Sequence, residues 1–144
     1  MLWVIGCVVT LAMTGLTRIL VTNVPTDRGL HDTYFVVEHS HYVFGLAMVF
    51  GFFATWYHSF PKLTGYAYSD PLARIHFWLL CIGVVIILAP QFLLLTRTVE
   101  QLADADLFRY WSLMSRIGSL ISTASTLVFF ANMVLSFVRR RPAG

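Results

Sequence analysis

Two histidines and a glutamate interrupt the apolar segment VVEHSHYVF at residues 36–44. Ionisable side chains in an apolar, membrane-spanning segment are costly unless they are paired or bind a ligand, so they mark candidate functional sites. On an α-helix, residues two apart lie about 200° around the axis. His39 and His41 therefore project from opposite faces and cannot chelate one ion together, because joint chelation needs a spacing of three or four residues.

This spacing suits two separate planar cofactors, one on each side of the helix. Haem iron accepts an axial imidazole, and haem is apolar enough to lie between membrane helices. A histidine in a membrane helix can equally form a hydrogen bond with a neighbouring helix. From the residues alone, haem ligation and interhelical hydrogen bonding are alternatives of equal standing.

Glu38 lies three residues before His41, so the two share a helix face. Di-iron bundles use a Glu-x-x-His unit twice, together with two further glutamates, and the sequence has no second copy of it. Burial favours the neutral, protonated acid. We therefore interpret Glu38 as a candidate for proton handling, or as the partner of a basic residue on a neighbouring helix.

The elements that position these side chains are predicted to be membrane helices. The chain has 144 residues, of which 58% are hydrophobic and 12% are charged, whereas soluble domains average about 25% charged. A helix needs about 20 apolar residues to cross a bilayer, and lipid requires backbone hydrogen bonds to be made internally. The sequence predicts an all-α membrane protein, a single membrane domain over residues 1–144, with four transmembrane helices at about 2–22, 33–57, 71–96 and 107–138.

Basic residues are distributed unevenly between the predicted connections. Lys62 and Arg74 flank the second connection and Arg139–Arg141 follow the last helix, whereas the opposite side is mixed and more acidic. Lys and Arg favour the cytoplasmic side of a membrane, so both termini are expected on the cytoplasmic or mitochondrial-matrix side. No basic face accompanies the arginines, so no nucleic-acid partner is expected.

The run LHDTYFVVEHSHYV at residues 30–43 resembles the tenth transmembrane helix of subunit I of the haem-copper oxidases, the cytochrome c oxidase family. The turn FPKLTG at residues 60–65 resembles the family's inner turn. Segments around Gly15, His76 and Gly118 are similar to its ninth, eleventh and twelfth helices. The chain thus resembles the C-terminal four helices of that subunit, which implies a bacterial plasma membrane or a mitochondrial inner membrane.

The resemblance implies specific cofactor ligands. His39 would be the axial ligand of the high-spin haem and His41 an axial ligand of the low-spin haem, with one or two haems shared with a partner chain. His31 and Asp32 match the family's magnesium or manganese site, and an imidazole with a hard carboxylate suits such an ion. Without the resemblance, these two residues would be interpreted as a polar cap on the second helix.

The resemblance also implies that the chain is not catalytic alone. The family's copper-ligating histidines and cross-linked tyrosine lie on the first eight helices, so the chain is expected to be the C-terminal part of a split subunit I. Its partners would be a larger membrane chain that supplies those eight helices, and other oxidase subunits. The whole complex would pass electrons from cytochrome c or quinol to oxygen.

Three departures from the family pattern keep other functions open. Ser40 stands where the family has an aromatic residue, Glu38 where it has a small apolar one, and Thr98–Gln101 where tandem arginines hold haem propionates, with Arg97 as the nearest substitute. One alternative is a diverged structural or assembly subunit of an oxidase-like complex that no longer ligates both haems. Another is a stand-alone haem or metal carrier that dimerises around a cofactor, with His41 from each copy as a ligand.

The remaining histidines and the glycines have ordinary structural interpretations. His58 and His76 are expected at the membrane interface rather than at a metal site. Small residues permit close helix approach in membranes, and this is expected at Gly15, Gly45, Gly51, Gly83 and Gly118.

Overall fold

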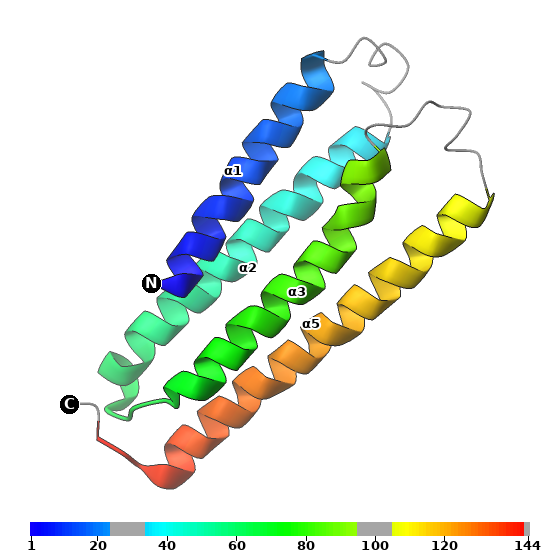
Figure 1. The fold of residues 1–144 in the computed structure, drawn as a ribbon. Coiled ribbons are helices and arrows are strands. Elements are labelled where there is room, and N and C mark those ends of the chain that lie inside the picture. Colours follow the sequence, from blue (N-terminus) through cyan, green and yellow to red (C-terminus); the bar gives the residue numbers. More distant parts are fainter. Residues whose placement is uncertain (24–33, 95–104, 143–144) are drawn as a thin grey trace. The chain divides into compact units, whose positions relative to one another are not determined.

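The computed structural model describes residues 1–23, 34–94 and 105–142; within them, side chains are described except at positions 14, 17–23, 34–40, 42, 91–94, 105, 107 and 108. The described chain forms four helices (Figure 1): α1 (Leu2–Asn23), α2 (Tyr34–Thr64), α3 (Asp70–Leu94) and α5 (Ala105–Arg139). The described residues include no strand, only an isolated bridge between Tyr66 and Pro142. The predicted all-α fold is confirmed.

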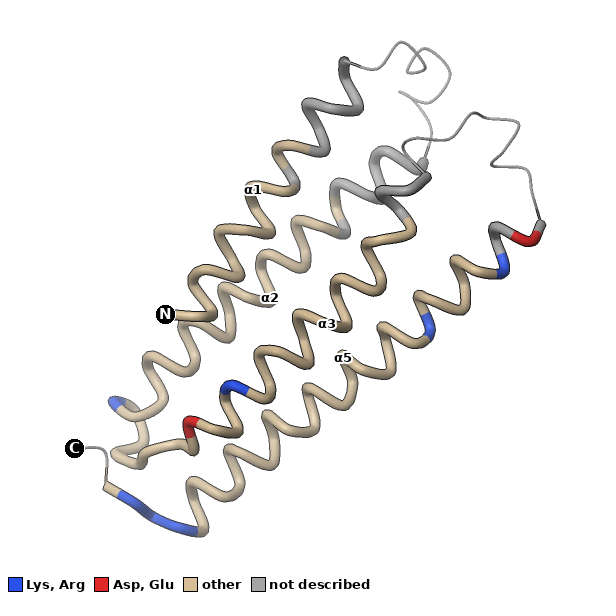
Figure 2. Tube along the Cα trace, in the orientation of Figure 1, with Lys and Arg blue, Asp and Glu red and all other residues tan. Residues whose placement is uncertain are grey.

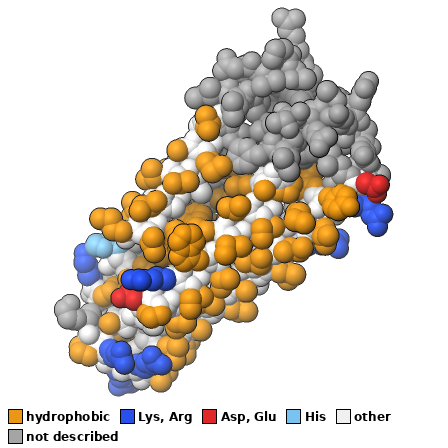
Figure 3. All heavy atoms as spheres, in the orientation of Figure 1, with side chains coloured by type: hydrophobic (Ala, Val, Ile, Leu, Met, Phe, Trp, Pro, Cys, Tyr) orange, Lys and Arg blue, Asp and Glu red, His pale blue; other side chains and the backbone are white. Residues whose placement is uncertain are grey.

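Three described segments are long and apolar enough to cross a membrane: Val43–Thr64, Asp70–Pro90 and Arg109–Arg139. The described apolar part of α1, Leu2–Met13, is shorter. Apolar side chains cover most of the helical surface in view in Figure 3. With 35 residues, α5 rises about 52 Å, so its ends extend beyond a hydrocarbon core of about 30 Å.

The chain divides into two compact units, Met1–Tyr57 and His58–Gly144. In the first unit, Trp3 of α1 packs against aromatic rings of α2. Its ring centroid lies 6.0 Å from that of Phe50, 5.1 Å from that of Phe53 and 5.5 Å from that of Tyr57. These rings hold α1 and α2 together at one end. The single membrane domain over residues 1–144 stays a prediction.

In the second unit, α3 and α5 approach so closely that their backbones are in contact range. A Cβ atom on Gly83 would lie 2.9 Å from the carbonyl oxygen of Gly118, and one on Gly118 would lie 2.7 Å from that of Gly83. Real Cβ atoms almost never come so near, so glycine is required at both positions. The prediction of close approach holds here, whereas a Cβ on Gly15 or Gly45 would meet no described atom within 4 Å.

Hydrogen bonds reinforce the same helix pair. The Ser125 hydroxyl donates to the carbonyl oxygen of His76 at 2.9 Å. The Asn132 side chain accepts from the Ser69 amide at 2.9 Å and donates to the Ser69 carbonyl at 3.2 Å. The side chains of Ser125, His76 and Asn132 are fully buried, whereas Ser69 is half-buried.

Helix α2 extends beyond its predicted end at about residue 57, and Gly65 terminates it. The helix continues past Tyr57 and through Pro61 to Thr64. Gly65 then adopts a left-handed backbone with φ of 72°, and its amide donates to the Pro61 carbonyl at 2.9 Å. This is the common glycine cap of a helix C-terminus, a conformation that side chains disfavour.

Candidate haem-ligand helix

The two histidines that the sequence singles out lie on one continuous helix. The backbone is helical from Tyr34 onward, so positions 39 and 41 differ by about 200° around the axis of α2. Neither position lies near a helix end that would break this geometry. The observed backbone of α2 therefore agrees with the helical geometry from which the two opposed positions were predicted.

His41 lies on an exposed row of α2. Its row continues through Gly45, Met48 and Phe52 at spacings of four, three and four residues. His41 itself is exposed, as are Met48 (62%) and Phe52 (56%). Among the described residues, nothing lies within 4 Å of a Cβ built on Gly45, so they leave room one turn from the imidazole, beside the apolar side chains of Met48 and Phe52.

His39 shares its helical row with Val43, Ala47 and Phe50. These three residues are 1%, 2% and 2% exposed, respectively. Position 39 is thus in register with the buried side of α2, and position 41 with its exposed side. Any group that approached the two positions would meet different surroundings on the two sides of the helix.

For several predicted site residues the structure describes the backbone alone, or they lie outside the described residues. Glu38 lies in the helical backbone of α2 at the i,i+3 spacing from His41, and Ser40 lies between the histidines. His31, Asp32, Arg97 and the segment 98–101 lie outside the described residues. The roles assigned to all of them stay predictions.

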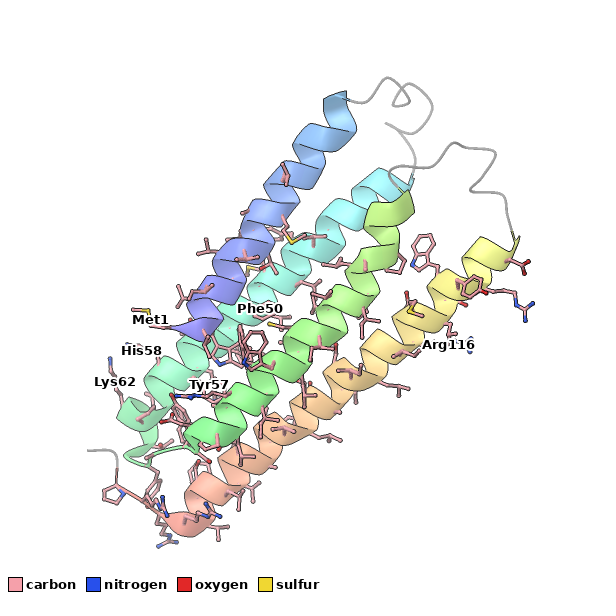
Figure 4. All side chains as sticks on the ribbon, viewed as in Figure 1. Met1, Phe50, Tyr57, His58, Lys62 and Arg116 are labelled. Carbon is pink, nitrogen blue, oxygen red and sulfur yellow. The ribbon has the colours of Figure 1, made fainter. Side chains whose placement is uncertain are left out.

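The other two described histidines differ from each other. His58 is exposed at the end of α2, where its Nε2 lies 2.9 Å from Nζ of Lys62; Figure 4 shows the two side chains next to each other. His76, expected at the interface, is instead fully buried in α3, with its ring centroid 5.4 Å from that of Phe129. Among the described residues, no group of three or more His, Cys, Asp or Glu side chains could hold a metal ion.

Residues of the α3–α5 contact escaped the sequence analysis. Ser125, Phe129, Asn132 and Ser136 recur at three- and four-residue intervals, which places them on one face of α5. That face is buried, so the spacing of small polar residues was an available signal.

Tyr68 lies in the connection before α3. Burial raises the pKa of its phenol, and the nearby Asp70 carboxylate adds to this shift, so the phenol is neutral at physiological pH.

The surroundings of His41 fit a flat, apolar, iron-bearing group. The exposed imidazole offers a nitrogen ligand, which haem iron accepts. Gly45 leaves room for a macrocycle edge, and Met48 and Phe52 supply apolar contact area on the same row. The donor chemistry and the open apolar face are thus both compatible with haem.

Comparison with known proteins identifies relatives over most of the chain. The family described as "Cytochrome C and Quinol oxidase polypeptide I" matches residues 1–121. Cytochrome c oxidase subunit 1 of Yarrowia lipolytica is 36% identical over 132 residues, which are 89% of this chain and 24% of the relative. Cytochrome c oxidase subunit 1 of Pecten maximus is 39% identical over 130 residues, 89% of this chain and 27% of the relative. The chain spans about a quarter of the length of these curated relatives.

Proposed function

Because the chain belongs to the cytochrome c and quinol oxidase polypeptide I family, we propose that α2 is a haem-ligating helix of an oxidase core. His41 is the axial ligand of a low-spin haem and His39 that of a high-spin haem. The observation that carries this proposal is the continuous helix through both histidines. Positions 39 and 41 lie on opposite sides of this helix, and the family implies haem cofactors, which supports the proposal.

The residues of this chain would bind and orient the cofactors rather than react. A bound haem supplies an iron that accepts and releases single electrons. His41 would hold that iron at the exposed side of α2, and Met48 and Phe52, with the space at Gly45, would shield the macrocycle from water. The copper ligands come from the other helices of the core, and the complete complex passes electrons from cytochrome c or quinol to oxygen.

Absorption spectra of the purified membrane complex test the ligand assignment. His41→Ala is expected to remove the low-spin haem bands, and His39→Ala the high-spin bands, because each change deletes one axial ligand. His58→Ala is the matched control, since it removes an imidazole from the same helix but from its far end. It is expected to leave every haem band unchanged.

Two results would overturn this assignment. If neither His39→Ala nor His41→Ala alters any band while the complex stays assembled, the histidines do not ligate haem. If His58→Ala changes the spectra as much as they do, the loss reflects a damaged α2 rather than a lost ligand.

In this proposal the first eight helices of the core belong to a partner chain, so subunit I is divided. Affinity purification of this chain from gently solubilised membranes is expected to recover a larger membrane polypeptide, other oxidase subunits and haem. Recovery of the chain alone, colourless and stable, would contradict the proposal. Denaturing electrophoresis of the recovered complex gives the mass of the polypeptide that carries α2, and a full-length subunit I there would contradict the division.

His31 and Asp32 are proposed to bind magnesium or manganese, and Glu38 to handle protons beside the haem. Manganese content, read by electron paramagnetic resonance of the complex, is expected to fall in His31→Ala and Asp32→Ala while the haem spectra persist.

Glu38→Gln keeps the shape of the side chain and removes its titratable carboxyl group, so it is expected to slow proton-coupled turnover without loss of haem.

Both termini are proposed to lie on the cytoplasmic or matrix side of a bacterial plasma membrane or a mitochondrial inner membrane. The support is the placement of Lys62, Arg74 and Arg139–Arg141, because positive residues favour that side. Leu63→Cys and Asp106→Cys lie at opposite ends of the helices. Membrane-impermeant thiol labelling of intact cells or mitoplasts is expected to modify only the second.

Glu38, Ser40 and the lack of an arginine pair at residues 98–101 favour a second candidate function. In it, the chain is a structural or assembly subunit of an oxidase-like complex that no longer ligates both haems. The histidine variants distinguish the two functions, because the second candidate predicts that at least one of them leaves all haem bands intact.

A further inference from the structure

Figure 2 shows Lys and Arg residues at one end of the second unit, where α2 ends, α3 begins and α5 ends. All of them are exposed. We call this set the basic end; its members are Lys62, Arg74, Arg139, Arg140 and Arg141. Asp70 is the nearest described carboxylate along the chain, so the described charge at this end is strongly positive.

The three arginines are not on a free tail. The Arg140 amide still donates to the Ser136 carbonyl at 3.1 Å, but Arg140 itself adopts φ of 43°, a left-handed conformation uncommon for residues other than glycine. The chain then turns back, and the Ala67 amide donates to the Arg141 carbonyl at 2.9 Å. Tyr66 and Pro142 form an isolated antiparallel bridge beside this bond.

Aromatic packing fixes the helix ends that carry the other charges. The ring centroid of Phe137 on α5 lies 5.8 Å from that of Phe60 on α2 and 6.1 Å from that of Tyr66 in the connection. Phe60 also contacts Tyr68, at 6.4 Å between ring centroids. These contacts hold the end of α2 beside the end of α5, so Lys62 and Arg139 come from neighbouring elements.

Exposed apolar side chains adjoin the basic end on both helices. Leu63 is 80% exposed on α2, while Val138 is 72% and Val134 is 61% exposed on α5. Side chains of this kind next to a cluster of cations at the end of spanning helices match an anionic lipid, whose phosphate is charged and whose tails are apolar. Arg, moreover, presents a planar fork of donors that suits phosphate oxygens.

We propose that the basic end is a binding site for the phosphate headgroups of anionic phospholipids, with their acyl chains against Leu63, Val134 and Val138. Hydrogen bonds of the backbone at Arg140 and Arg141 hold the attachment points of these side chains at the basic end rather than on a free tail. The site is independent of haem ligation and faces the leaflet opposite to the α5 end that carries Arg109.

Lipid retention by the full-length chain tests the site. The membrane complex that contains the full-length chain is purified in detergent, incubated with mixed micelles of phosphatidylglycerol and phosphatidylcholine, and analysed by native mass spectrometry. The chain is expected to retain phosphatidylglycerol preferentially. Juxtamembrane basic residues contribute about fivefold each to such binding, so the triple variant Arg139→Gln, Arg140→Asn, Arg141→Gln should lower the preference by about a hundredfold.

The matched control neutralises two arginines in the first half of the same helix, away from the basic end. Arg109→Gln with Arg116→Gln removes two charges from α5 (Arg116 is labelled in Figure 4), one of which already lies 3.9 Å from the Asp106 carboxylate. This double variant is expected to keep the full preference. An equal loss in both variants would overturn the proposal, because net charge alone would then explain retention.

Ala67→Pro tests whether the anchored geometry matters. It keeps every charge but removes the amide that donates to the Arg141 carbonyl, so the preference is expected to fall several-fold while the helix content by circular dichroism is unchanged. An unchanged preference would overturn the fixed site, as would retention of phosphatidylcholine equal to that of phosphatidylglycerol. If an acidic protein competes the lipid away only from the wild type, the site belongs to that partner and the proposal fails.

Discussion

In the unit Met1–Tyr57, α1 meets α2 through large aromatic side chains, whereas α3 and α5 in the unit His58–Gly144 meet through their backbones. Trp3 reaches across to Phe50, Phe53 and Tyr57 with ring centroids 5.1–6.0 Å away. Gly83 and Gly118 instead remove side chains altogether, and buried hydrogen bonds flank them. The α3–α5 pair is thus joined by backbone and polar contacts. In the other unit, the row of α2 that carries His41 stays exposed.

That exposed row is where the proposed cofactor chemistry lies. His41, Met48 and Phe52 face outward on α2, although an exposed imidazole is poorly accommodated by lipid. In α3, by contrast, His76 is fully buried against Phe129 by the chain itself. One histidine is thus enclosed by its own unit, whereas the other lies on an exposed face of its helix.

The largest expected effect is loss of the ring that joins α1 to α2. Trp3→Ala should destabilise the first unit by about 3–5 kcal/mol, as for other buried aromatic truncations. Hydrogen exchange measured by mass spectrometry should show lost protection in α1 and the first part of α2, with α3 and α5 unchanged. Trp78→Ala is the control, because Trp78 is 58% exposed and should have little effect.

If Trp3→Ala weakened protection equally in α3 and α5, the two units would not be energetically separable. The contrast between them would then be one of packing style alone.

A smaller effect is expected from one methyl group at the α3–α5 crossing. Gly118→Ala places a Cβ against the Gly83 carbonyl oxygen, so the helices must separate, at about 1–3 kcal/mol of destabilisation. The same substitution at Gly45 meets open space and should be neutral or stabilising by up to about 1 kcal/mol, since alanine favours helix. Thermal unfolding in detergent, followed by circular dichroism, compares the two.

Equal melting temperatures for Gly118→Ala and Gly45→Ala would contradict the backbone-contact description of the second unit.

The smallest effect concerns a single buried hydrogen bond. Ser125→Ala removes the donor to the His76 carbonyl and should cost about 0.6 kcal/mol, the average for such bonds between membrane helices. Ser119→Ala, at an exposed position on the same helix, is the control. A double-mutant cycle with Gly118→Ala then reports whether the polar and backbone contacts act as one unit, and strict additivity would show that they do not.

Hydropathy predicted the helical fold because lipid leaves few alternatives for a polar backbone. It did not predict where α2 ends, since Pro61 is tolerated in the last turn and the left-handed Gly65 terminates the helix. The position of His76 was missed for a related reason. Its neighbour Arg74 suggested an interface, but burial depends on Phe129 and Ser125, which come from a helix far along the sequence.

The candidate site was predictable to a different degree. The opposed positions of His39 and His41 follow from helix geometry alone, and the observed backbone of α2 agrees with it. The sequence could not show that position 39 is in register with a buried row and position 41 with an exposed row. This follows only from the packing of Val43 and Ala47. The ligand roles themselves depend on groups outside the chain, so neither sequence nor fold determines them.

The glycine crossing between α3 and α5 has a consequence for biogenesis. Only residues 95–104 separate the two helices along the chain, so their contacts join segments that are near each other in sequence, and such contacts form early. We expect this hairpin to assemble as soon as both segments leave the insertion machinery, ahead of any prosthetic group. Newly made protein would then be a partly assembled intermediate in the bilayer, and its maturation would be limited by the delivery of cofactors and partner helices to α2.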